Sequence, residues 1–252
     1  MRVATWNLDH ASHSRPVTGQ LDRILEINPD IIVLTETYAK VDLASVGYEV
    51  LASDLNKYGK NYSAIWSKWP IEQAISTYDP ETATCAKVGA PHSSVIVYGT
   101  ILTWRMDKGL DGKSRQWEEH HKEIVKQGED WFRIQNEFPG LAFIVAGDFN
   151  QTRGDSSAYR SLEGVRLLDE ELSRNMLDCL TEEDFGAAGK LKPDPRKGRV
   201  RHNIDHICVT RDAFRVEQVG AWDHFTATQE LSDHNGVFVD LVPIRIKSGV
   251  SS

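Results

Sequence analysis

The chain alternates between two patterns of apolar and polar positions. Short, nearly continuous apolar runs predict buried strands, and apolar residues three or four apart predict amphipathic helices. The predicted strands cover residues 2–6, 31–35, 63–67, 94–102, 141–146, 203–210 and 237–242. The predicted helices cover residues 21–28 and 114–138, and each ends just before a proline. With no internal repeat or low-complexity linker, this alternation predicts one mixed α/β domain over residues 1–252.

Polar residues stand at the ends of several predicted strands, most visibly in the segment VAGDFN at 145–150. Each one alone is explained by a turn or a cap, because turns favour Asn, Asp and Gly. Together they favour a site, since the ends of neighbouring strands converge where α/β folds bind ligands. The set is Asn7, Asp9, Glu36, Asp148, Asn150, Asp205, Asp233 and His234.

This set is chemically selective. It contains carboxylates, two carboxamides and one histidine, and no serine or cysteine that would act as a nucleophile. Oxygen ligands of this kind suit a hard cation such as Mg²⁺ or Mn²⁺. Asp233 beside His234 adds a group that titrates near neutral pH.

Composition and charge narrow the classes of partner. The 252 residues are 40% hydrophobic and 26% charged, as in ordinary globular proteins. The net charge of -8 argues against a broad basic face for nucleic acid, although a local basic patch stays open. Three widely spaced cysteines, Cys85, Cys179 and Cys208, predict neither a disulfide framework nor a zinc site. No apolar run is long enough to span a membrane, and no signal segment opens the chain, so a cytoplasmic location is expected.

The polar segments also carry a resemblance to a known family. TWNLD, LTE, GDFN, IDHI and SDH occur in the order expected of the endonuclease/exonuclease/phosphatase superfamily, from Trp6 to His234. GDFN followed by SDH is the specific part of this resemblance. It implies a four-layer α/β sandwich, in which two packed mixed β-sheets are flanked by helices. It also implies an enzyme that hydrolyses phosphoesters with a divalent metal, Mg²⁺ or Mn²⁺.

The resemblance assigns roles residue by residue. Glu36 looks like the main metal ligand, and Asn7, Asp9 and Asp233 complete the expected metal set. Asp148 and Asn150 look like the groups that orient the attacking water and hold the phosphate. His234 closes the site, and Asp205 is expected to orient its imidazole.

One position departs from the family pattern. Members often carry a His or Tyr on the central strand to contact the phosphate, but Ile101 stands there in VIVYGTILTW. Tyr98 or Thr100 is the expected replacement. His206, next to Asp205, is expected on the opposite strand face with a structural role.

The substrate is the least determined part. A basic segment over residues 190–202 leads into Asp205, so Arg199 and Arg201 are expected to bind phosphate, or else the segment is a solvated loop. Trp222 either stacks on a base or anchors a loop. We expect a phosphorylated substrate. The simplest hypothesis is that the protein is a phosphodiesterase or nuclease that cleaves nucleic acid. The alternatives are hydrolysis of a small-molecule or lipid head-group phosphoester and, less favoured, a non-catalytic binding module; no protein partner is indicated.

Overall fold

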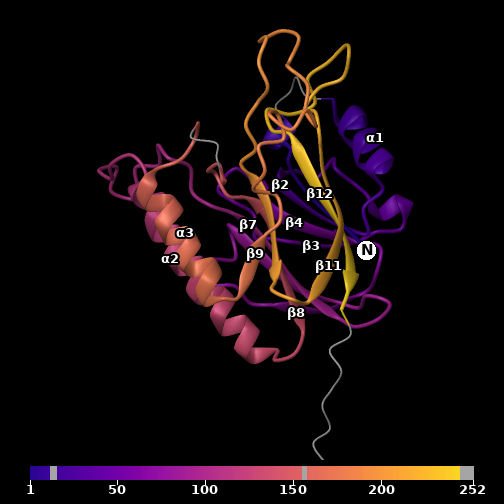
Figure 1. The fold of residues 1–252 in the computed structure, drawn as a ribbon, viewed down its shortest axis with the longest axis vertical. Coiled ribbons are helices and arrows are strands. Elements are labelled where there is room, and N and C mark those ends of the chain that lie inside the picture. The colour runs from indigo at the N-terminus through magenta and orange to yellow at the C-terminus, as the bar shows by residue number, and fades with distance from the viewer. Residues whose placement is uncertain (12–15, 155–157, 245–252) are drawn as a thin grey trace, which may run out of the picture.

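Two six-stranded sheets form the centre of the protein in a computed structural model that describes residues 1–11, 16–154 and 158–244 (Figure 1). The first sheet has the order β11-β12-β1-β2-β4-β3. Its strands, in that order, are Phe214–Trp222, Gly236–Pro243, Arg2–Asn7, Ile31–Thr37, Asn61–Ser67 and Glu49–Ala52. The second sheet has the order β5-β6-β7-β8-β10-β9. Its strands are Ile71–Ile75, Ala83–Val88, Val95–Ile101, Ala142–Asp148, Asp205–Thr210 and Leu177–Cys179.

Both sheets are mixed. β1 and β2 are parallel in the first sheet, β7 and β8 are parallel in the second, and the other pairs are antiparallel. The four parallel strands are almost entirely buried, which explains their continuous apolar runs. Two central parallel pairs therefore face each other across the core.

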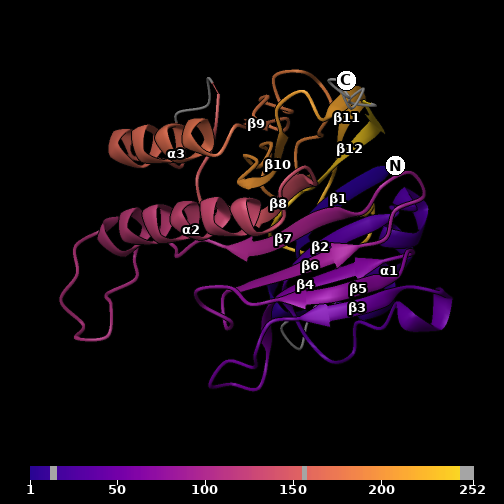
Figure 2. The ribbon, with the colours of Figure 1, turned by 90° about the horizontal axis from the view of Figure 1, so that it is seen from below.

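Helices cover the outer face of each sheet. Residues such as Val33, Val97 and Ile144 fill the space between the sheets. The helix α1, Val17–Ile27, packs through Ile24 against the first sheet. The helices α2, Glu118–Glu137, and α3, Leu162–Arg174, lie side by side on the second (Figure 2). The expected four-layer α/β sandwich is confirmed. Short 3₁₀ turns occur at Asp9–Ala11 and Ala44–Val46.

Every strand and helix predicted from the apolar pattern is present, and five strands and α3 are added to them. The added strands include β3 and β5. Both are largely exposed, so their sequences show little apolar pattern. The second predicted helix begins at Glu118 rather than near residue 114, because Trp117 takes the left-handed conformation, with φ of 71°. In the described ranges, no helix is both long and apolar enough to cross a membrane.

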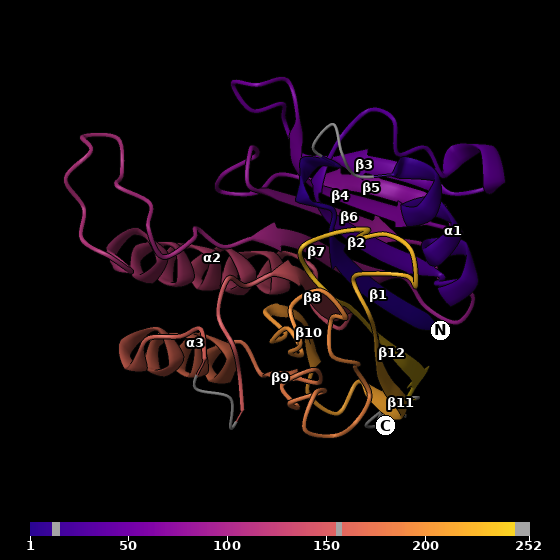
Figure 3. The ribbon, with the colours of Figure 1, turned by 90° about the horizontal axis from the view of Figure 1, so that it is seen from above.

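At one end of the sandwich, two central strands approach closely and several loops gather. There β8 passes so close to β7 that a Cβ on Gly147 would lie 1.8 Å from the Thr100 carbonyl oxygen, with φ of 148°. Only glycine fits this position. The loops before β10 and between β11 and β12 rise at the same end, which Figure 3 views from above.

Candidate active site

Four strand ends from the two sheets meet at this end of the molecule. Asn7 ends β1, Glu36 lies near the end of β2, and Asp148 ends β8 directly opposite Asp205 of β10. The Asn7 side-chain Nδ2 donates to Asp148 Oδ2 at 2.9 Å and to Glu36 Oε1 at 3.2 Å. A buried carboxamide therefore ties together carboxylates from both sheets.

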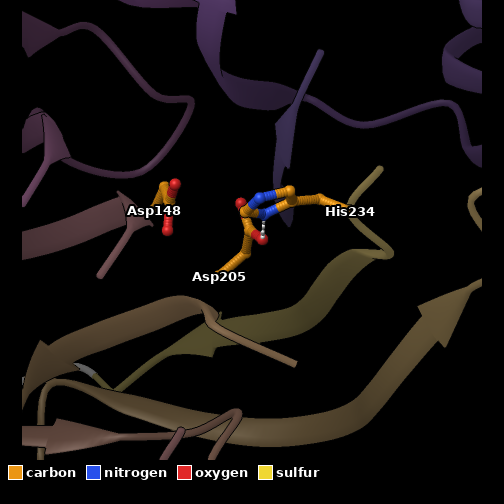
Figure 4. A group of neighbouring side chains, drawn as sticks. All are labelled: Asp148, Asp205 and His234. Atoms are coloured by element: carbon orange, nitrogen blue, oxygen red, sulfur yellow. Dashed lines mark hydrogen bonds and ion pairs between the residues drawn. The ribbon is translucent and has the colours of Figure 1, made fainter. Parts of the chain in front are cut away.

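Asp205 and His234 form the second part of the cluster (Figure 4). His234 Nδ1 lies 2.6 Å from Asp205 Oδ2, and the carboxylate accepts this hydrogen bond. The Asp148 carboxylate faces the same imidazole, and ligand atoms of all three residues lie within 4.8 Å of one another. The structure thus brings together three residues that are 57 and 29 positions apart in sequence.

Ser232 and Trp6 hold the segment that carries His234. Ser232 Oγ donates to the Asn7 carbonyl at 2.6 Å and accepts from the His234 backbone N–H at 3.0 Å. Trp6 Nε1 donates to the His234 carbonyl at 2.7 Å. The sequence reasoning missed both residues, although each stands next to a polar segment, in SDH and TWNLD.

Asn150 supports Asp148 from the loop that follows β8. Its backbone N–H donates to Asp148 Oδ1 at 2.8 Å, and its Nδ2 donates to the Leu102 carbonyl at 2.8 Å. Asn150 adopts a left-handed φ of 49°, which asparagine tolerates better than most residues. The GDFN segment therefore places Asp148 and then restrains its carboxylate.

Burial and charge shift the titration of the cluster in a consistent way. Burial raises the pKa of Glu36, against the hydrogen bond from Asn7 that lowers it. Burial likewise raises the pKa of Asp148, with His234 opposing and Asp205 reinforcing the shift. Burial lowers the pKa of His234, but the carboxylates of Asp205, Asp148 and Asp233 outweigh it and raise the pKa to about 10. The site concentrates negative charge, which His234 neutralises only in part.

The donor set fits a hard divalent cation. Glu36, Asp148 and Asp205 bring three carboxylates together, with the Asn7 Nδ2 between the first two, while the Asn7 amide oxygen accepts from the Asp9 backbone N–H. Asp205 Oδ1 is buried and has no hydrogen-bond partner among the described residues. A cation held beside Glu36 would relieve the crowding of negative charge in the cluster. The oxygen-rich chemistry matches Mg²⁺ or Mn²⁺ rather than a soft metal.

Two further acids lie at the rim of the cluster. Asp9 begins a 3₁₀ turn, and its backbone N–H donates to Asn7 Oδ1 at 2.8 Å. Asp233 Oδ2 accepts from Arg201 Nη2 at 3.0 Å. His10, which the sequence reasoning missed, has its Nε2 3.6 Å from Glu36 Oε2. Its only signal in the sequence was its place directly after Asp9.

The expected phosphate contacts on β7 need correction. Tyr98 and Thr100 are fully buried on the helix side of the second sheet, away from Asp148. The Tyr98 hydroxyl donates to Asp130 Oδ2 at 3.1 Å, and the Thr100 hydroxyl donates to Gln127 Oε1 of α2. The alternation of strand faces places these hydroxyls under the helix layer, while Ile101 pairs with Asp148 in register. Neither hydroxyl belongs to the site.

The stacking role considered for Trp222 is also wrong. Its side chain is 4% exposed and contacts Trp6 edge to face, with ring centroids 5.7 Å apart. Gly236 leaves the space that the indole occupies. Trp222 is therefore a core residue. His206, by contrast, lies on the helix side with ring nitrogens near the Thr181 and Gln151 carbonyls, as expected of a structural histidine.

The basic segment is largely neutralised by neighbouring acids. Lys190 pairs with Glu183, Arg196 with Asp194 and Glu230, and Lys197 with Glu230. Arg201 is the cation that reaches the cluster, through Asp233. Arg199 is exposed on the loop. The structure thus brings Arg201 to the site and leaves Arg199 at the surface.

A model of the endonuclease/exonuclease/phosphatase family matches residues 4–234. The chain belongs to this family. Its members are phosphoester hydrolases that use divalent metals, so the expectation of an enzyme is confirmed. The comparison with curated proteins found no match.

Several solved structures share the fold of this family member. The human Nocturnin catalytic domain with bound sulfate matches at a TM-score of 0.65 and 18% identity, covering 97% of this chain and 94% of that one. The 3′ phosphatase NExo from Neisseria, bound to a product DNA hairpin, matches at 0.67 and 19%, covering 96% and 99%. A mannosyl-6-phosphatase from Bacteroides thetaiotaomicron matches at 0.60 and 16%, covering 96% and 99%. At these identities the likeness extends to the fold alone.

Proposed function

We propose that the protein hydrolyses phosphoesters at the cluster of Asn7, Glu36, Asp148, Asp205 and His234. The carrying observation is the Asn7 carboxamide, which joins the Glu36 and Asp148 carboxylates from opposite sheets. Glu36, Asn7, Asp9 and Asp233 would hold the divalent cation. When bound, the cation would stabilise charge that develops on the phosphoryl oxygens and lower the pKa of a coordinated water.

The residues of the chain supply positioning and proton transfer. Asp148, held by Asn7 and by the backbone of Asn150, accepts a hydrogen bond from the attacking water and orients it. His234 presents its Nε2 toward the phosphate, because its Nδ1 is bound to Asp205. Asp205 is therefore a positioning residue that fixes the orientation of the imidazole.

We propose that the substrate is a small phosphoester, or a phosphoester at the end of a larger molecule. A duplex bound along its backbone needs several cations that are free to meet phosphates. Here the acids beside residues 190–202 already pair with Lys190, Arg196 and Lys197. Arg201, with a side chain 37% exposed beside Asp233, is placed to meet one phosphate at the site.

A polynucleotide is the second candidate, because one feature at the rim favours it. The guanidinium of Arg105 lies 4.9 Å from the ring centre of Tyr159. The Tyr159 carbonyl accepts from the Thr152 backbone N–H at 2.7 Å, in the loop that follows Asp148 and Asn150. Trp104, from the same loop as Arg105, is 53% exposed. An aromatic and cationic rim of this kind accepts unpaired bases.

Hydrolysis of a substrate panel tests the proposed metal-dependent mechanism and the proposed substrate class. The panel holds phosphomonoesters, nucleotides, single-stranded DNA and RNA and duplex DNA, each with Mg²⁺, with Mn²⁺ and with excess chelator. We expect activity only with metal, and Glu36→Gln should raise the metal concentration needed for half-maximal rate. Glu26→Gln, which changes a side chain 69% exposed on α1, is the matched control and should change nothing. Full activity in excess chelator would contradict the proposed mechanism, and a preference for duplex DNA would contradict the proposed substrate class.

A further inference from the structure

Cys179 and Cys208 lie directly opposite each other on the antiparallel strands β9 and β10. The flanking positions carry the ladder hydrogen bonds, since the Leu180 N–H donates to the Ile207 carbonyl and the Arg211 N–H to the Met176 carbonyl. The cysteines therefore occupy a non-hydrogen-bonded pair, in which Cα atoms typically lie about 4.5 Å apart. Disulfides span Cα separations of about 4.4–6.8 Å, so this pair is within bonding reach without backbone movement.

The two thiols differ in their access to solvent. Cys179 is half-buried and lines a pocket of about 340 Å³ between α3 and β9, whereas Cys208 is fully buried behind it. Cys85, the third cysteine, is buried elsewhere in the second sheet. Cys179 is therefore the cysteine of this pair that borders the pocket.

Arg153 is a buried cation in the wall of this pocket. Its side chain is only 9% exposed, and its Nη1 lies 2.7 Å from Asp169 Oδ1. Its Nε is buried and has no hydrogen-bond partner among the described residues. A buried guanidinium with a spare donor favours the thiolate over the thiol of a neighbouring cysteine.

The environment also distinguishes the chemical roles of the two sulfurs. The pKa of Cys179 lies well below its ordinary value, chiefly through a hydrogen bond from Cys208, with smaller contributions from His206 and Arg153. The pKa of Cys208 lies well above its ordinary value, chiefly through burial. These directions favour Cys179 over Cys208 as the thiolate of the pair.

We propose that Cys179 is an oxidisable thiol that reacts with hydrogen peroxide and is then resolved by Cys208 into a cross-strand disulfide. The Cys179 thiolate attacks one peroxide oxygen, the O–O bond breaks, and hydroxide leaves as the sulfenic acid forms. The Cys208 sulfur then attacks the Cys179 sulfur, the S–O bond breaks, and water leaves. Overall two thiols and one peroxide give one disulfide and two waters.

The charges around the pocket select the kind of oxidant. Asp169, Asp178 and Glu182 line it together with Arg153, and Arg211 pairs with Asp178, so these side chains carry one negative charge in excess. A negative rim repels anionic reagents and admits neutral ones. The site is therefore suited to peroxide rather than to an anionic disulfide, and neutral iodoacetamide should modify Cys179 faster than anionic iodoacetate.

Peptide mass spectrometry of the full chain tests the proposal. Cleavage after Lys and Arg puts Cys85, Cys179 and Cys208 on separate peptides, 69–87, 175–190 and 202–211. After peroxide treatment and alkylation under denaturing conditions, we expect peptides 175–190 and 202–211 to be linked, and Cys85 to be alkylated. In Cys208→Ser, dimedone should trap a sulfenic acid at Cys179.

Three further variants test the roles of the third cysteine and of Arg153. Cys85→Ser should leave the link intact, and Arg153→Met should slow alkylation of Cys179 several-fold. Arg166→Met removes the same charge from the exposed face of α3 and should leave that rate unchanged. Circular dichroism should show that each variant is folded. Alkylation of both Cys179 and Cys208 after peroxide treatment would overturn the proposal, as would equal rates in Arg153→Met and the wild type.

Discussion

Two buried Asp–His pairs lie next to each other at the site end of the molecule, and they use the same chemistry differently. In the first pair, His234 Nδ1 lies 2.6 Å from Asp205 Oδ2. In the second, His224 Nε2 lies 3.3 Å from Asp194 Oδ2. Both acids and both histidines are at least nine-tenths buried. Residue type and burial therefore do not distinguish the pairs.

The difference lies in what their remaining polar atoms contact. In the second pair, His224 Nδ1 lies 2.8 Å from Asn235 Oδ1, and Asp194 Oδ1 accepts from the Arg196 backbone N–H at 2.9 Å. In the first pair, Asp205 Oδ1 has no partner within the described ranges, and His234 Nε2 is 3.7 Å from Asp233 Oδ1. The second pair therefore has the contacts of a structural pair, whereas the first pair keeps polar atoms that a ligand would satisfy.

The second pair also explains how the loops over the site are held. Asn235, next to His234 in sequence, donates from its Nδ2 to the Arg201 carbonyl at 2.9 Å. Arg201 in turn reaches Asp233. Although Asp194, His224 and Glu230 form a possible metal group by distance, Arg196 and Lys197 already pair with its carboxylates. We therefore assign it to loop support.

The largest expected effect is on the first pair and the carboxylate that faces it. Asp148→Asn and His234→Ala should each lower kcat by roughly two to four orders of magnitude, the usual scale for positioning and proton-transfer groups. The free energy of unfolding should change little in Asp148→Asn, whereas His234→Ala leaves the Asp205 carboxylate buried without its partner and should lower it by about 3 kcal/mol. Turnover and chemical denaturation are the measurements, and near wild-type turnover in either variant would remove that residue from the proposed mechanism.

Coupling within the first pair is the next expectation. If Asp205 acts by orienting His234, the losses in Asp205→Ala and His234→Ala should not multiply. The double variant should be about as slow as the slower single variant, as measured by kcat/KM. Fully multiplicative losses would mean that Asp205 acts independently, for example on the cation.

The second pair should affect stability more than turnover. His224→Ala leaves the Asp194 carboxylate buried without one partner, and we expect the free energy of unfolding to fall by about 3 kcal/mol. The turnover of the folded protein should fall less than tenfold. His92→Ala, at an exposed position, is the matched control. A loss of turnover as large as that of His234→Ala, without a loss of stability, would erase the distinction between the pairs.

The smallest effect on catalysis is expected for Arg201, whose carbonyl accepts a hydrogen bond from Asn235 beside the second pair. Arg201→Ala should raise KM a few-fold for a small substrate and leave kcat within a factor of about three, because one phosphate contact is lost. Arg199→Ala, at the exposed loop surface, should change neither. On a polynucleotide, each lost phosphate contact would flatten the log–log dependence of KM on salt by about one unit or less. A steep slope that neither variant changes would place the phosphate contacts elsewhere.

Several parts of the site were accessible from the sequence because the signal was local. Apolar runs marked the central strands, and polar residues directly after them marked Asn7, Glu36 and Asp148. The errors arose where the direction of a side chain mattered. Tyr98 and Thr100 stand on a strand that reaches the site, but strand alternation turns both toward α2. The sequence placed Trp222 beside a loop, but in the structure Gly236 and Trp6 enclose its indole.

The sequence by itself determined the α/β class, the central strands, the family and most of the polar residues at the strand ends. These features follow from the spacing of residues along the chain, where each strand carries its own pattern of burial. Only the tertiary structure decided which Asp–His pair keeps unsatisfied polar atoms and that Arg196 and Lys197 are neutralised. It also decided that Cys179 faces Cys208. Those properties depend on contacts between segments far apart in sequence, which local spacing does not encode.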